Sequence, residues 1–113
     1  MNEQIIFHEV QIGRGLVPLA QHGYVVVTPG QVTLLGSDRR ELAAGPITGS
    51  APAYVRFTRR QTVSLTLAGQ KYHLSPGWGA TVGSPLPGGQ RTREAAALLL
   101  DCLLNDGVVP QHT

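Results

Sequence analysis

The chain has 113 residues, a net charge of +2 at pH 7 and 42% hydrophobic residues. This length fits a single domain, residues 1–113, that can bury a core without a metal or a disulfide. The hydrophobic content excludes a disordered chain, and 14 glycines with 8 prolines indicate many turns between short elements. Together these values favour a mainly β fold.

The cysteine content and the apolar runs bear on the cellular setting. Cys102 is the single cysteine, so no internal disulfide can form. The N-terminal residues, Met-Asn-Glu-Gln, lack the basic start of a secretory signal. The longest apolar runs, 24–27 and 95–100, are far shorter than the roughly 20 residues of a membrane-spanning helix. We therefore expect a cytoplasmic protein with no membrane span.

Residues 4–12 alternate between apolar and polar side chains, which predicts a first strand. Strict alternation would place Ile6, Val10 and Ile12 on one face, with His8 between them.

The clearest local signal lies in the next part of the chain. Residues 16–23 contain a proline and end on a glycine, and we expect an irregular connection with a short extended piece there. Two strands are predicted at 24–28 and 31–35, joined through Pro29-Gly30. Proline presets the second position of a type II turn and glycine supplies the positive φ of the third, so this segment predicts a hairpin.

Further strands are expected at 40–44, 54–58 and 62–67. In the last of these, apolar and polar residues alternate, so that the apolar set faces the core and the polar set faces water. The inward set is Val63, Leu65 and Leu67, and the outward set is Thr62, Ser64 and Thr66. A tight reversal at 68–70 then leads into a strand at 71–75.

A Gly- and Pro-rich connection, 76–91, precedes a predicted helix at 92–105, and a tail follows. Thr92 is a candidate N-cap, and Glu94 in the first turn would suit the helix dipole. Gly107 occupies the place of a C′ glycine that ends the helix.

This helix has more apolar surface than one sheet requires. Its apolar arc spans roughly 200°, against the roughly 100° that a helix lying on one sheet buries. Ala96, Leu100 and Leu104 extend the arc beyond the expected core stripe. Either the long connections around residue 50 and Trp78 cover these three side chains, or another molecule does. In the second case they form an interaction interface.

Basic residues are concentrated in the middle of the chain. Residues 39–71 have six basic residues against Glu41, a net charge of +5. The basic residues are Arg39, Arg40, Arg56, Arg59, Arg60 and Lys71. They suit either the solvated face of a sheet or an anion-binding surface. Nucleic acid is a less favoured partner because few aromatic side chains are interleaved with them.

The chemistry-bearing residues do not form a recognisable catalytic or metal-binding motif. The histidines at 8, 22, 73 and 112 lack metal-ligand spacing. Ser84 is not in a nucleophile elbow, and the carboxylates fall at termini, turns and helix ends. We therefore expect no enzymatic activity, no metal and no cofactor.

The predicted order of elements resembles the pleckstrin-homology superfold, particularly its GRAM-like and bacterial relatives. Residues 23–34 resemble the second and third strands of GRAM-type domains, 62–74 their later hairpin, and 92–104 their closing helix. The resemblance implies a partly open antiparallel barrel of about seven short strands closed by a helix. It also implies a binding module, because this superfold hosts lipid, phosphopeptide and proline-rich peptide binding as well as scaffolding.

Three functions follow as expectations. The first is a non-enzymatic interaction or assembly module that associates with itself or with a protein partner through its helix and an adjacent sheet surface. The second is binding of anionic lipid headgroups or another polyanion by the Arg-rich middle segment. The third is a small structural subunit of a larger particle.

Overall fold

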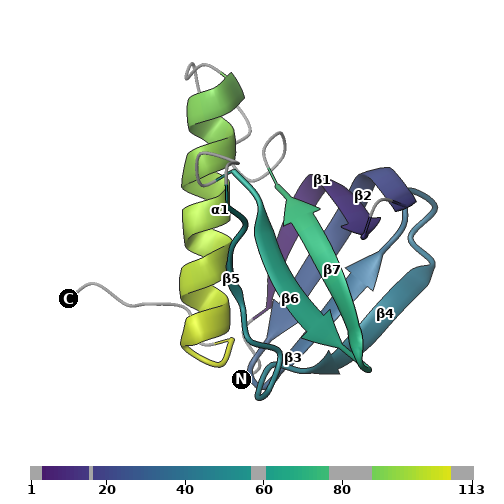
Figure 1. The fold of residues 1–113 in the computed structure, drawn as a ribbon, viewed down its shortest axis with the longest axis vertical. Helices are drawn as coiled ribbons and strands as arrows, with labels where there is room; N and C mark the ends of the chain where they lie inside the picture. The colour runs from purple at the N-terminus through teal and green to yellow at the C-terminus, as the bar shows by residue number, and fades with distance from the viewer. Residues whose placement is uncertain (1–3, 16, 57–60, 77–87, 108–113) are drawn as a thin grey trace.

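The computed structural model describes residues 4–15, 17–56, 61–76 and 88–107, in which seven strands precede one helix (Figure 1). The elements are β1 (Ile5–Arg14), β2 (Val17–Thr28), β3 (Gln31–Leu35), β4 (Glu41–Pro46), β5 (Ala53–Tyr54), β6 (Val63–Leu67), β7 (Gln70–Ser75) and α1 (Gly88–Leu104). The predicted fold class, mainly antiparallel β with a C-terminal helix, is confirmed.

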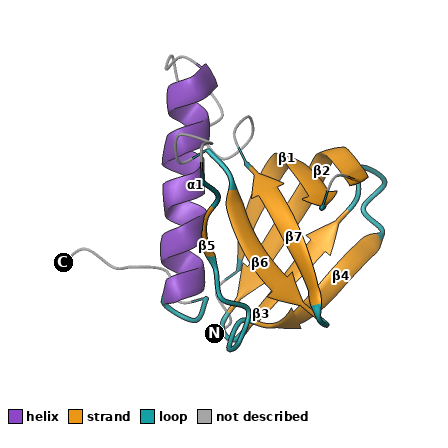
Figure 2. Ribbon diagram, in the orientation of Figure 1, coloured by secondary structure: helices purple, strands orange, loops and turns teal. Residues whose placement is uncertain are grey.

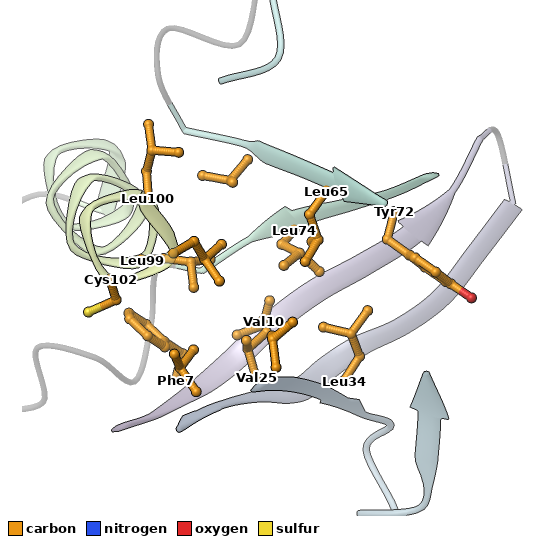
Figure 3. Close-up of a cluster of buried hydrophobic side chains, with 14 of the residues drawn as sticks. Phe7, Val10, Val25, Leu34, Leu65, Tyr72, Leu74, Leu99, Leu100 and Cys102 are labelled. Atoms are coloured by element: carbon orange, nitrogen blue, oxygen red, sulfur yellow. The ribbon is translucent and has the colours of Figure 1, made fainter. Parts of the chain in front are cut away.

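All strands belong to one sheet with the order β4-β3-β2-β1-β7-β6-β5, and every pair is antiparallel. The sheet is not fully closed, because its terminal strands β4 and β5 do not pair with each other. It folds over on itself, so that β6 and β7 face β1, β2 and β3 across a hydrophobic core (Figure 3). Helix α1 lies across the open side of this core, beside β5 (Figure 2).

The predicted hairpin at Pro29-Gly30 is confirmed. Thr28 pairs with Gln31 at its end, and Gly30 has a φ of +82°. The connection expected at 16–23, irregular with a short extended piece, is wrong for residues 17–23, because β2 is extended throughout from Val17 onward. Its first half pairs with β1, so strand pairing overrides the local turn propensity of these residues.

A β-bulge in β1 changes which side chains face the core. Phe7 pairs with Val25 and Val10 pairs with Gly23, so His8 and Glu9 together lie opposite one residue of β2. Glu9 has a φ of +53°, as the extra residue of a bulge often does. The alternation shifts by one residue at this point.

The bulge corrects the prediction for the first strand. Val10 and Ile12 are buried as expected, but Ile6 is 43% exposed. Phe7 takes the inward position instead and is fully buried. Strict alternation failed because a bulge leaves little mark on the sequence.

Later strands follow the predictions in part. The strand expected at 40–44 is β4, and that expected at 54–58 is limited to β5, with 57–58 outside the described residues. In β6 the inward set is buried as predicted. Ser64, expected to face water, is only 6% exposed because β5 lies beside it, and its hydroxyl donates to the carbonyl of Ala53 (3.4 Å).

Helix α1 begins earlier than predicted and ends in a Schellman motif. It starts at Gly88, so Thr92 is not an N-cap and Glu94 does not lie in the first turn. At its end, the amide of Asp106 donates to the carbonyl of Leu103 (3.2 Å), and that of Gly107 donates to Cys102 (2.7 Å). Asp106, with a φ of +56°, is therefore the C′ residue, and Gly107 is one position further along.

Backbone hydrogen bonds connect this helix end to both layers of the sheet. The amide of Gly30, in the β2–β3 turn, donates to the carbonyl of Asp106 (2.7 Å), and its own carbonyl accepts the amide of Ile47 (3.1 Å). The amide and the hydroxyl of Ser50 both donate to Ile47, and the carbonyl of Ser50 accepts the amide of Thr66 in β6. The segment 47–50 thus links the helix end to β6.

Gly107→Ala is expected to destabilise the protein by about 3 kcal/mol, because an added Cβ would lie 2.1 Å from the carbonyl oxygen of Thr28. Gly30→Ala is the matched control. Gly30 also has a positive φ, but its Cβ would meet nothing within 4 Å, so only the cost of the backbone conformation, about 1 kcal/mol, is expected. Urea unfolding measures both, and equal losses would contradict the docking of the helix end on this turn.

Ala68→Asn is expected to stabilise the protein by about 0.5–1 kcal/mol. The two-residue β6–β7 turn has positive φ at Ala68 (+51°) and Gly69 (+78°), which is the turn that Asn-Gly favours. Thermal unfolding should show a raised midpoint, whereas Gly69→Ala should lower it. A lower midpoint for Ala68→Asn would contradict this turn geometry.

Candidate functional site

Most of the apolar arc of α1 is buried by the chain itself. The buried residues are Ala95, Ala96, Leu99, Leu100, Cys102 and Leu103, an arc of about 160° at 100° per residue. Leu99 points into the core between the two layers (Figure 3). A helix that closes the open side of a folded-over sheet contacts both layers, so it buries a wider arc than a helix on one flat sheet.

This arrangement corrects the predicted interface. Ala96 is fully buried and Leu100 is 9% exposed, so neither is available to a partner. Leu104 is 63% exposed, and Leu98 is 41% exposed. The two exposed leucines lie about 120° apart around the helix, on opposite flanks of the buried arc. They therefore belong to two different surfaces.

The first surface is a groove at the C-terminal end of α1, with a volume of about 260 Å³, which we call the helix-end groove. It is lined by Ile47, Thr48, Gly49, Ala51, Pro52, Leu103, Leu104 and Asp106. The connection around residue 50, one of the two expected covers, thus lies beside the helix and borders Leu104. Trp78, the other, lies outside the described residues. The edge strand β5 follows directly after the groove segment.

The second surface lies on the outer face of β1, β2 and β3, with a volume of about 240 Å³, and we call it the sheet-face groove. It is lined by Gln4, Ile6, His8, Tyr24, Val26, Leu35 and Arg39. The sequence pattern did not predict this groove, because it placed Ile6 in the core. The sequence nevertheless contains a signal for this groove. Tyr24 and Val26, which alternate with the buried Val25 and Val27, are themselves apolar although they lie on the outer face of the sheet.

Tyr24 is the centre of the sheet-face groove. The His8 ring meets the Tyr24 ring edge-on, with centroids 5.8 Å apart, and the Arg39 guanidinium carbon lies 5.3 Å from the Tyr24 centroid. Arg39 has a φ of +66°, and its amide donates to the carbonyl of Gly36 (2.9 Å). Among the described residues, no carboxylate forms an ion pair with Arg39. Its charge is therefore available to a ligand.

The other basic residues do not gather around Arg39. Arg40 forms an ion pair with Asp38 (3.5 Å) in the same turn, and Lys71 is exposed at the start of β7. Arg56 follows β5, whereas Arg39 lies between β3 and β4. The remaining pair, residues 59 and 60, lies outside the described residues. Apart from the adjacent Arg39 and Arg40, these basic residues of the described chain thus belong to different elements.

No other cluster of reactive groups occurs in the described residues. None of their histidines, cysteines or acidic residues forms a group of three or more that could hold a metal ion. Burial, with a smaller contribution from Asp101, raises the pKa of the Cys102 thiol, which disfavours its reactive thiolate. His22 and Glu9 form an exposed pair beside the bulge. A shallow hollow of about 490 Å³ over β1, β2 and β7 contains His73 but no acidic residue.

Comparison with known proteins adds no relative: no family model and no curated protein matches this chain. Within the described residues, no helix is long and apolar enough to cross a membrane.

Leu100→Ala is expected to lower the free energy of unfolding by about 2–4 kcal/mol, because it leaves a cavity under the helix. Leu104→Ala should change it by less than about 0.5 kcal/mol, since this side chain is mostly in solvent. Urea denaturation of the two variants measures the difference. A small loss for Leu100→Ala would mean that Leu100 is not a core residue.

Proposed function

We propose that this protein is a non-enzymatic interaction module, built like a pleckstrin-homology-type domain, that binds an extended peptide segment of a partner protein in the helix-end groove. The observation that carries the proposal is the exposure of Leu104 at the rim of an apolar groove that leads to an edge strand. Of the predicted interface residues, Leu104 is thus retained, while Ala96 and Leu100 belong to the core.

The lining of the groove suits an apolar anchor. Ile47, Pro52, Leu103 and Leu104 provide aliphatic surface, and the volume of about 260 Å³ has room for a large apolar side chain. The groove is also held by backbone hydrogen bonds from Gly30 to its two sides, so little ordering is required on binding.

The position of β5 favours an extended ligand. As the last strand of the sheet order, β5 pairs with β6 on one edge, and α1 lies beside it (Figure 2). A ligand that follows the chain segment leading to β5 is itself extended, and the groove then selects alternate side chains of the ligand. The groove and β5 are continuous along the chain from residue 47 to residue 54.

The electrostatics of the groove favour a basic residue in the ligand. Asp106 is the ionisable side chain in its lining, and α1 has no basic residue in its last turn to offset the negative end of the helix dipole. The expected ligand is therefore an extended segment with a large apolar side chain and a nearby lysine or arginine.

Leu104→Glu is expected to weaken peptide binding by about tenfold or more, because it places a carboxylate at the apolar rim. The probe is a phage-displayed library of random peptides, selected on the wild-type protein, from which the best binder is synthesised. Fluorescence anisotropy then measures its dissociation constant with each variant.

Leu98→Glu is the matched control, because Leu98 is also exposed on α1 but does not line the helix-end groove. It should bind the peptide as the wild type does. Amide chemical shifts should change at residues 47–54 and 103–107 on binding. A library without binders, or a selected peptide that binds Leu104→Glu equally well, would contradict the proposal.

We include a cytoplasmic location in this proposal, since the one cysteine is a buried free thiol. The basic residues are given no anion-binding role in it. Arg39 and Arg40 share the β3–β4 turn, Arg40 is paired with Asp38, and Arg56 and Lys71 belong to other parts of the described chain.

A further inference from the structure

The sheet-face groove has the chemistry of a docking surface for an acidic apolar partner. Ile6, Val26 and Leu35 form an aliphatic floor, and Tyr24 contributes an aromatic ring. Among the described residues, Arg39 adds a cation without a carboxylate partner, and no acidic residue lines the groove. A suitable ligand thus has one aliphatic side chain and at least one carboxylate beside it.

The outer face of α1 has the complementary features. Leu98 is 41% exposed, and the exposed residues Glu94 and Asp101 lie one turn before and after it. Positions i, i+4 and i+7 share one helix face, so the three side chains form an apolar centre with a carboxylate at each end. This face points away from the sheet, because the opposite arc of α1 is buried in the core.

We propose that the sheet-face groove of one molecule binds the outer helix face of a second copy, with Leu98 in the groove and a carboxylate of Glu94 or Asp101 paired with Arg39. The groove volume of about 240 Å³ has room for a leucine side chain. Packing an exposed helix face on an exposed sheet face is also an ordinary mode of element packing.

The two surfaces differ, so the contact is heterologous. A heterologous contact joins copies head to tail and generates rings or open chains, not a closed two-fold dimer. One molecule cannot satisfy both surfaces by itself, since its helix face is directed away from its own sheet. The contact is small, and weak, salt-sensitive association is expected.

A mixing experiment tests the head-to-tail contact. Arg39→Glu removes the cation of the groove but keeps the helix face, whereas Leu98→Glu removes the apolar anchor but keeps the groove. Sedimentation velocity should show concentration-dependent assembly of the wild type and a monomer of 12.0 kDa for each variant alone. An equimolar mixture should form a species of twice that mass and nothing larger, because only one intact pair of surfaces remains.

Neighbouring residues provide matched controls. Arg40→Glu changes the adjacent arginine, which is already paired with Asp38, and Leu104→Glu changes the leucine on the other flank of α1. Both should assemble as the wild type does, and circular dichroism should show that all four variants are folded.

Three results would overturn the proposal: a wild type that is monomeric at every soluble concentration, an Arg39→Glu variant that assembles normally, or a mixture of the two variants that stays monomeric. Peptide binding in the helix-end groove depends on neither Arg39 nor Leu98. The proposed function and this assembly can therefore fail independently.

Discussion

The backbone of Gly30 is the point on which the arrangement of this molecule depends. Its amide binds the end of α1 through Asp106, and its carbonyl binds Ile47 at the start of the segment that leads to β6. The β2–β3 turn thereby fixes the position of the helix and of the layer formed by β6 and β7 relative to the layer formed by β1, β2 and β3. These bonds add a directional contact to the apolar packing of the helix on the core, which by itself is not directional.

The same bonds build the helix-end groove. Leu103, Leu104 and Asp106 form one wall, and the segment 47–52 forms the other. Because the groove is assembled from the helix end and a backbone-anchored connection, its shape is set by the fold and not by mobile side chains. Such preorganisation lowers the entropic cost of binding an extended ligand.

The sheet-face groove has a different origin, in the bulge of β1. The extra residue at Glu9 shifts the strand by one position, so Phe7 enters the core while Ile6 remains exposed beside Val26. A strand without this bulge would bury Ile6 and remove part of the groove floor. A local irregularity thus creates an apolar surface on the outer face of the sheet, next to the cation of Arg39.

The amino-acid sequence by itself determined the fold class, the Pro29-Gly30 hairpin, the inward residues of β6 and the presence of a terminal helix. These features rest on local conformational preference and on hydrophobic period, which neighbouring residues encode. Tertiary structure alone decided that Ile6 is exposed, that 17–23 is a strand, and that Ala96 and Leu100 belong to the core. Each of these outcomes depends on a partner that is distant in sequence. The exposure of Ile6 depends on the pairing of β2 with the bulge, and the strand at 17–23 depends on its pairing with β1. The burial of Ala96 and Leu100 depends on the two layers of the sheet beneath α1. The helix does contain more leucine than one flat sheet would bury, but these side chains do not form a single interface. Because the helix closes a folded-over sheet, most of its leucines are buried, and Leu98 and Leu104 are exposed on separate surfaces.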